Sequence, residues 1–148
     1  MSYVVVDTDV LAIHHVFTWD KRHATNEEFL NAVERPATTV HNVLELVGIV
    51  CKALRKAEAR SIYDAYMLSK KWAVLFPEMP LGWDEFCDFI FPCMERVMSY
   101  GAALIAWTVD ENADVIEAFV TWNKKHFSGK LGVPVRTPKE WLEGGLRA

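Results

Sequence analysis

The chain has 148 residues, 51% of which are hydrophobic, and it carries a formal net charge of −4 at pH 7. This length and hydrophobic fraction predict a single globular domain over residues 1–148 and exclude an intrinsically disordered chain. The acidic balance excludes a general nucleic-acid coat protein, which would be basic, but it is compatible with an enzyme that holds RNA through a local patch.

Three cysteines (Cys51, Cys87 and Cys93) form no CxxC pair and are odd in number. They predict reduced thiols and hence a cytoplasmic protein, because structural disulfides belong to oxidising compartments. The first apolar run has no basic residues before it and ends at Asp7, so we expect no signal peptide. No stretch reaches the roughly 18 apolar residues of a membrane span, so we expect no membrane partner.

Short β-branched runs alternate with helical patterns along the chain. In the first part of the chain, these patterns predict a strand at 3–6, a helix at about 9–17, a helix from 26 that ends before Pro36, and a strand at 37–40. Four helices are expected next: from 42 through the fifties, at 57–75, from about 83, and at 101–112. The chain is expected to end with strands at 116–121 and 133–135 and a final helix from 137. Strands that alternate with helices predict a parallel sheet covered by helices. The expected fold class is therefore α/β, with three layers (α/β/α) and a mostly parallel central sheet.

Capping residues and apolar spacing define two of the predicted helices more closely. Asn42 is expected to cap the helix that follows the second strand, and Leu44, Val47 and Cys51 form its expected apolar face. The motif TPKEWL (137–142) has the residue types of a capping box, with proline at the first helical position.

The segment that begins at residue 83 is more apolar than one helix face requires. Its apolar residues include Trp83, Phe86, Phe89, Ile90, Phe91 and Met94. One interpretation is a core helix, and the other is a contact surface for a second copy of the chain or for a partner helix. Pro92 either kinks this helix or begins a second one.

Two acidic residues follow predicted strands. Asp7 comes directly after the strand at 3–6, and Glu45 lies in the helix after the strand at 37–40. Neighbouring strands of a parallel sheet end at the same edge, so we expect both carboxylates in one pocket. Carboxylates are hard ligands that suit Mg²⁺ or Mn²⁺, and such ions activate water and offset phosphate charge. The alternatives are that Asp7 only caps the following helix and that Glu45 lies on a solvated face.

Four segments carry a resemblance to a known family. They are VVVDTDV (4–10), TTVHNVLEL (38–46), GAALIAW (101–107) and FVTWNKKHF (119–127). In order and wording they resemble the PIN-domain ribonucleases, which include the toxins of VapBC-type toxin–antitoxin pairs. The resemblance covers nearly the whole chain and implies an endoribonuclease that hydrolyses RNA phosphodiesters with Mg²⁺ or Mn²⁺.

The same resemblance implies particular site residues and partners. Asp7, Glu45 and residue 102 correspond to the metal ligands, and Asn123 corresponds to a residue that orients water or an outer ligand. The implied partners are an RNA substrate, a cognate antitoxin protein and a second copy of the chain in a homodimer.

The sequence departs from the family pattern at the third acidic position. The family motif reads roughly D-A-L-I-A, whereas residues 102–106 read AALIA, so Ala102 stands where an aspartate is expected. Either a ligand was removed by engineering, which the retained neighbouring motif favours, or the chain is a natural member with lost or weakened activity. Asp110 is roughly 12 Å further along the helix axis, too far to replace a ligand. Asp9 is the better-placed substitute.

Basic residues after the fourth segment are the candidates for RNA binding. Lys124, Lys125 and Lys130 are placed to hold phosphates, and the alternative is a solvated face. A second basic group, at 52–60, favours a solvated face. His126 favours packing or a loop hydrogen bond.

Two other functions are compatible with this pattern. A PIN-like domain without catalysis would bind RNA or a protein partner and leave it intact. A phosphotransfer receiver-like domain also clusters acids at strand ends, but it needs an acceptor aspartate after a third strand, and the sequence predicts none there.

Overall fold

Five short strands form one sheet in which every neighbouring pair is parallel. The computed structural model describes residues 1–145. The strands are β1 (Tyr3–Val6), β2 (Pro36–Thr39), β3 (Ala73–Leu75), β4 (Ile116–Val120) and β5 (Val135–Arg136). Their spatial order is β3-β2-β1-β4-β5, which places β1 at the centre. The valines of β1 suit this position, because a central parallel strand is buried on both faces.

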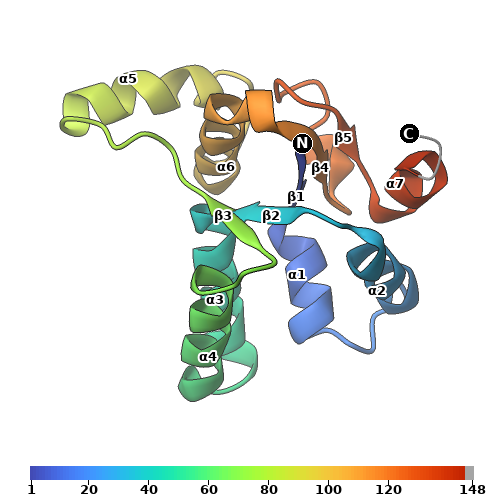
Figure 1. Ribbon diagram of the computed structural model, residues 1–148. Helices are drawn as coiled ribbons and strands as arrows, with labels where there is room; N and C mark the ends of the chain where they lie inside the picture. The colour runs from blue at the N-terminus through green and yellow to red at the C-terminus, as the bar shows by residue number, and fades with distance from the viewer. Residues whose placement is uncertain (146–148) are drawn as a thin grey trace.

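Helices cover both faces of the sheet. They are α1 (Thr8–His15), α2 (His23–Ala32), α3 (Val40–Ala53), α4 (Lys56–Met67), α5 (Trp83–Met94), α6 (Tyr100–Glu111) and α7 (Pro138–Gly145), with short 3-10 helices η1 (Ala113–Val115) and η2 (Lys124–His126). Figure 1 shows α1 to α4 on one side of the sheet and α5 and α6 on the other. The expected three-layer α/β/α class is therefore confirmed.

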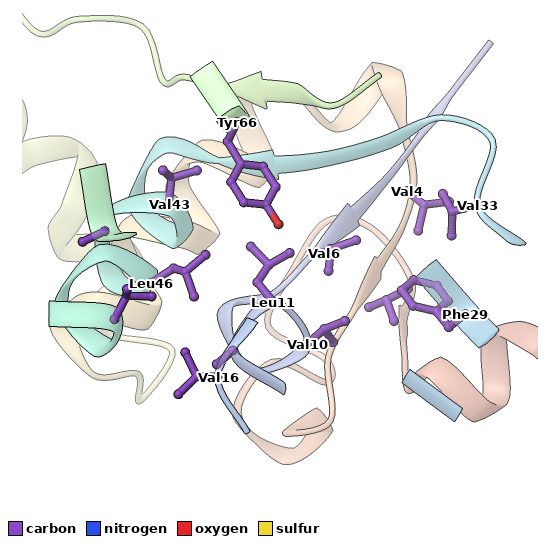
Figure 2. Close-up of a cluster of buried hydrophobic side chains, with 14 residues drawn as sticks. Val4, Val6, Val10, Leu11, Val16, Phe29, Val33, Val43, Leu46 and Tyr66 are labelled. Atoms are coloured by element: carbon purple, nitrogen blue, oxygen red, sulfur yellow. The ribbon is translucent and has the colours of Figure 1, made fainter. Parts of the chain in front are cut away.

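Alternate side chains of β1 divide the core into two clusters. Val4 and Val6 pack with residues of α1, α2, α3 and α4, whereas Val5 packs with α5, α6 and Phe119 of β4. This alternation is the two-residue period of a strand. Figure 2 shows the first cluster, with Leu11 of α1 between β1 and the residues of α3.

The helix after the second strand begins earlier than the sequence predicted. Thr39, not Asn42, is the N-cap of α3: Thr39 Oγ1 accepts a hydrogen bond from the Asn42 N–H at 3.2 Å, and Asn42 Oδ1 accepts one from the Thr39 N–H at 3.3 Å. The prediction was wrong because β2 ends at Thr39, which leaves Asn42 at the third helical position. The side-chain oxygen of Asn42 is held by Thr39, and its Nδ2 donates to Asp7 and Thr8 at the end of β1.

The expected apolar face of α3 was wrong at Leu44, which is 53% exposed, and at Cys51, which is exposed. Its third residue, Val47, is partly buried and packs against the core, whose buried α3 residues are Val43, Leu46 and Val50. The helix has apolar residues on two adjacent faces, so spacing alone does not identify the one that packs on the sheet.

The sequence predicted one helix over 57–75, whereas the structure has a helix followed by a short strand in this range. α4 ends at Met67, and Ala73–Leu75 pairs with β2 as edge strand β3. Ser69 Oγ holds the turn between them by accepting hydrogen bonds from the N–H groups of Lys71 at 3.1 Å and Trp72 at 2.9 Å. A three-residue strand is too short to show a period in the sequence, so the sheet edge determines its conformation.

The apolar segment forms one helix, α5, with Pro92 inside it. Only Ile90 and Cys93 of this helix are buried, and Figure 1 shows its far end extending beyond the rest of the fold. The core-helix interpretation therefore applies to part of the segment only. By length and hydropathy, none of the helices within residues 1–145 could cross a membrane.

Candidate functional site

A cavity of about 680 Å³ opens beside the carboxyl ends of β1 and β4. The four site residues expected from the sequence, Asp7, Glu45, Ala102 and Asn123, all line it. They come from the end of β1, from α3, from the first turn of α6 and from the turn after β4. Ligands of open parallel sheets bind at this edge.

Asp7 is both a helix cap and a wall of the cavity. It directly follows β1, is the N-cap of α1 and is only 6% exposed. Its Oδ1 accepts hydrogen bonds from the Thr8 N–H at 2.8 Å and from Asn42 Nδ2 at 2.9 Å, while its Oδ2 accepts one from Thr121 Oγ1 at 2.7 Å. Three donors from three segments therefore hold this carboxyl group in one orientation.

Hydrogen bonds connect Asp7 with Glu45. Asn42 Nδ2 also donates to Thr8 Oγ1 at 2.9 Å, and Thr8 Oγ1 donates to Glu45 Oε1 at 2.6 Å. The other oxygen, Glu45 Oε2, lies 3.2 Å from the place that a Cβ on Gly101 would take. Glycine at 101 therefore lets α6 approach the carboxylate closely.

Ala102 lies in the first turn of α6, where Ser99 is the N-cap and Ser99 Oγ accepts a hydrogen bond from the Ala102 N–H at 3.3 Å. The methyl side chain is half-buried in the same cavity as Asp7 and Glu45. A helix N-terminus favours negative charge, so this position could carry a carboxylate that faces the other two.

Asp9 holds the turn that carries Asn123. Asp9 Oδ2 accepts hydrogen bonds from the Trp122 N–H at 3.0 Å and from Thr121 Oγ1 at 3.2 Å. Asp9 Oδ1 is buried with no hydrogen-bond partner among the described residues. The sequence suggested Asp9 as a substitute ligand, and in the structure it connects α1 with the turn after β4.

Burial and negative charge make Asp7 a weak acid. Its pKa is raised from 3.8 to about 7, mainly by burial and also by the charges of Asp9 and Glu45. The hydrogen bonds from Thr121 and Thr8 lower this pKa but only partly offset the rise. Burial likewise raises the pKa of Asp9. Asp7 therefore exchanges its proton near neutral pH, and a cation in the cavity would favour the ionised form.

The donor set determines how well the cavity suits a divalent cation. Asp7 and Glu45 supply hard carboxylate oxygens of the kind that Mg²⁺ and Mn²⁺ prefer. Within residues 1–145, however, no group of three or more acidic, histidine or cysteine side chains is placed to hold a metal ion. The residues present fit a divalent cation in kind, and the third carboxylate that the family resemblance implies would stand at Ala102.

The lysines expected to bind RNA lie outside this cavity. Lys124 Nζ forms an ion pair with Glu140 at 2.9 Å, and Lys130 Nζ donates to the Val97 carbonyl at 3.0 Å. Neither these two nor Lys125 lines the cavity. Their contact with RNA stays a prediction.

Two other cations line the cavity instead, Arg22 and Lys52. The sequence did not single out Arg22, and it assigned Lys52, in the basic group at 52–60, to a solvated face. Lys52 is two helical turns after Glu45 on α3, a spacing that places both on one side of the helix. Arg22 precedes α2 and has no such relation to the acidic motifs. His126 also lines the cavity, and its Nδ1 accepts a hydrogen bond from Asn123 Nδ2 at 3.1 Å, which is the expected loop contact.

No protein-family model and no curated protein matches the sequence. Several solved structures share its fold. A toxin–antitoxin complex from Klebsiella pneumoniae is 18% identical, with a TM-score of 0.56 over 91% of this chain and 97% of that chain. VapC20 from Mycobacterium tuberculosis, a sarcin–ricin loop cleaving toxin, is 16% identical, with a TM-score of 0.56 over 78% of this chain and 86% of that chain. VapBC-1 from nontypeable Haemophilus influenzae is 12% identical, with a TM-score of 0.61 over 94% and 99%.

At these identities the similarity establishes the fold and leaves the activity open. The shared architecture agrees with the resemblance carried by the four sequence segments and with the parallel order β3-β2-β1-β4-β5. The chain therefore has the PIN-like fold of the VapC-type toxins.

Proposed function

We propose that the protein is a toxin-type, metal-dependent endoribonuclease whose site is weakened by the missing carboxylate at position 102. The observation that carries this proposal is that Asp7, Glu45, Ala102 and Asn123 line a single cavity. The sarcin–ricin loop cleaving toxin of the same fold supports an RNA phosphodiester as the substrate.

In this proposal the two carboxylates have one task. Asp7 and Glu45 would hold Mg²⁺ or Mn²⁺, and the bound ion would supply activated water and offset the phosphate charge. Asn42 and Thr8 keep both carboxylates in place through their hydrogen bonds. Asn123, held against His126, is placed at the cavity wall to orient water.

The RNA backbone would contact the cations of the cavity wall. Lys52 is exposed, and Arg22 is exposed with its guanidinium paired to Asp20 at 2.9 Å. Contacts to phosphates give affinity without sequence preference. Lys52, which lines the cavity, is better placed for this task than Lys124 or Lys130, whose ammonium groups already have protein partners outside it.

A toxin-type protein would have a cognate antitoxin, act in the cytoplasm and form a homodimer. The neighbouring toxin–antitoxin complex supports the antitoxin as a partner. The acidic cavity suits neutralisation by a basic group of such a partner, because an unpaired carboxylate cluster attracts cations of any origin.

One observation favours a second function. Ala102 leaves fewer than three candidate ligands together in residues 1–145, so a PIN-like module that binds RNA or a protein and does not cut is the alternative. A carboxylate at position 102 distinguishes the two functions. It would increase RNA cleavage if the protein is a nuclease, and it would leave RNA intact if the protein is a binding module.

The test is to restore the carboxylate with Ala102→Asp and to use Ala102→Asn as its matched control. Both side chains have similar size, so only the charge differs. With Mg²⁺ or Mn²⁺, Ala102→Asp should cleave a labelled single-stranded RNA faster than the parent chain by orders of magnitude, since metal supplies both the nucleophile and charge stabilisation. Ala102→Asn should stay at the parent rate.

Metal binding provides a second measurement that does not depend on cleavage. Calorimetric titration should show tighter Mn²⁺ binding by Ala102→Asp than by Ala102→Asn, and adding Glu45→Gln to Ala102→Asp should abolish both the tighter binding and the cleavage. A folded Ala102→Asp protein that binds Mn²⁺ and leaves several RNA substrates intact would support the non-catalytic module.

A further inference from the structure

The cavity that holds the acidic residues extends beyond them, between α1 and α3. Figure 1 shows these two helices side by side, and they contact each other. The walls of this stretch are formed by Ala12, Ile13 and Phe17 on the side of α1 and by Glu45, Gly48, Ile49 and Lys52 of α3. The four α3 residues are spaced i, i+3, i+4 and i+7, so they form one stripe of the helix. We call this stretch of the cavity the α1–α3 arm.

Gly48 leaves the middle of the α1–α3 arm without a side chain. It lies inside α3, and glycine is the poorest helix former apart from proline. Its φ is not positive, and a Cβ built on it would meet no atom within 4 Å. Gly101 differs, because a Cβ there would lie 3.2 Å from Glu45 Oε2. The fold therefore gives no reason for glycine at position 48, whereas glycine does let a ligand in the cavity lie against the helix backbone.

The two ends of the α1–α3 arm carry opposite charges. Asp7 and Glu45 lie at one end, and Lys52 lies at the other, roughly 10 Å from Glu45 along the helix axis. Lys52 is exposed and, within residues 1–145, takes part in no ion pair. A cation held by the carboxylates would bind one phosphate of a nucleic-acid strand, and Lys52 would bind the next. A basic protein segment along the arm would instead face Lys52 with like charge.

Between its charged ends the α1–α3 arm is apolar. Ala12 and Ile13 are buried, and Phe17 and Ile49 are half-buried. Phe17 also lies beside Trp19, with ring centroids 5.6 Å apart, and Trp19 is 77% exposed. The unstacked bases of single-stranded RNA pack on aromatic and apolar side chains of this kind. The wall therefore suits a base whose neighbouring phosphates are held at the two ends.

We propose that the α1–α3 arm binds the nucleotide next to the scissile phosphate. Its base lies against Phe17 and Ile49. Its backbone crosses α3 at Gly48, and its outer phosphate contacts Lys52. The inference rests on the proposed ribonuclease function, because the acidic end defines which phosphate is cut. A larger side chain at position 48 would occupy the space of this nucleotide.

The test fills the α1–α3 arm with Gly48→Leu. The parent chain and each variant are titrated into a labelled single-stranded RNA of about 10 nucleotides with Mn²⁺, and fluorescence anisotropy measures binding. Gly48→Leu should weaken binding by at least about tenfold, and Gly48→Ala should weaken it less. The matched control is Ala57→Leu, which adds a leucine at an exposed position of α4 outside the cavity and should change affinity by less than about twofold.

Urea unfolding separates a blocked arm from a damaged fold. Gly48→Ala and Gly48→Leu should both unfold at a higher urea concentration than the parent chain. Alanine and leucine are better helix formers than glycine, and no atom lies within 4 Å of the new Cβ. Gly48→Met, which has an unbranched and adaptable side chain, is the second filling variant and should behave as Gly48→Leu does. Weaker RNA binding by a more stable protein cannot arise from misfolding.

Cleavage by Ala102→Asp distinguishes this inference from the proposed function. If both hold, Ala102→Asp cleaves RNA, and adding Gly48→Leu lowers kcat/KM by at least about tenfold. Binding and cleavage that Gly48→Leu and Gly48→Met leave unchanged would overturn the nucleotide subsite and keep the ribonuclease. Binding that both variants weaken, without cleavage by Ala102→Asp, would overturn the ribonuclease and keep RNA in the α1–α3 arm. A parent chain and an Ala102→Asp variant that do not bind RNA would overturn both.

Discussion

Replacing Asp7 with asparagine is expected to stabilise the metal-free protein, and to do so more at pH 8 than at pH 5. Burial raises the pKa of Asp7 from 3.8 to about 7. Between these values the native state binds more protons than the unfolded state, so the free energy of unfolding falls as pH rises. The loss levels off above pH 7, where Asp7 is ionised in both states.

The size of the effect follows from the two pKa values. Each unit of pKa difference corresponds to about 1.4 kcal/mol. The rise from 3.8 to about 7 therefore lowers the native state's stability at high pH by about 4 kcal/mol, of which about 3 kcal/mol is lost between pH 5 and pH 8. These contributions disappear in Asp7→Asn.

Asparagine keeps most of the hydrogen bonds of Asp7. Its Oδ1 can accept from the Thr8 N–H and Asn42 Nδ2, as Asp7 Oδ1 does. Its Nδ2 would donate to Thr121 Oγ1, whose hydroxyl proton can turn to Asp9 Oδ2, 3.2 Å away. Weaker bonds to an uncharged acceptor would offset the gain by about 1 kcal/mol, which leaves a net stabilisation of about 3 kcal/mol at pH 8.

Urea unfolding at pH 5, 6, 7 and 8 in the presence of EDTA measures this effect. The difference in the free energy of unfolding between Asp7→Asn and the parent chain should grow by about 3 kcal/mol across the series. Taking the difference removes the contributions of titrating groups that do not interact with Asp7. An Asp7→Asn protein that is less stable than the parent at pH 8, or a difference that does not change with pH, would refute the assignment of a raised pKa to Asp7.

Three further predictions concern the cap of α3, the half-buried His15 and the cavity wall. Thr39→Ala should lower the free energy of unfolding by about 1–2 kcal/mol in urea, because it removes the N-cap of α3. Burial lowers the pKa of His15 from 6.5 to about 4, so stability should be lost as pH falls from 6.5 toward 4, and His15→Gln should flatten that part of an acid titration followed by circular dichroism. Lys52→Glu should weaken RNA binding, measured by anisotropy across salt concentrations, more than Lys125→Glu does, because only the first lies in the cavity wall.

The parts of the fold that sequence reasoning predicted have strong local signals. Buried β-branched runs indicated β1, and the TPKEWL motif indicated α7 with its cap: Glu140 N–H donates to Thr137 Oγ1 at 3.1 Å and the Thr137 N–H donates to Glu140 Oε1 at 2.9 Å. In both cases neighbouring residues alone define the element. The strand β3 lacks such a signal, because its three residues become a strand only by pairing with β2.

The candidate site likewise contains residues that the sequence could predict and residues that it could not. Residues directly after a strand, such as Asp7, were predictable because topology places strand ends at one edge of the sheet. Arg22 was not predictable, because it lies in the segment between α1 and α2, and the strand order does not determine where that segment passes. Lys124 was misleading for the same reason: it is adjacent to Asn123 in sequence, yet its ammonium group is paired with Glu140 of α7.

We expect position 102 to connect stability with metal affinity. With alanine there, Asp7 already has a pKa of about 7 because of burial and the charges of Asp9 and Glu45. A third carboxylate would add repulsion without a cation and would give the cation a third oxygen when it binds. Completing the site should therefore make the metal-free protein less stable and the metal-bound protein more stable, by linkage. Ala102→Asn adds no charge, so a change seen in both variants would arise from side-chain size, whereas opposite changes with and without Mn²⁺ in Ala102→Asp alone would arise from the carboxylate.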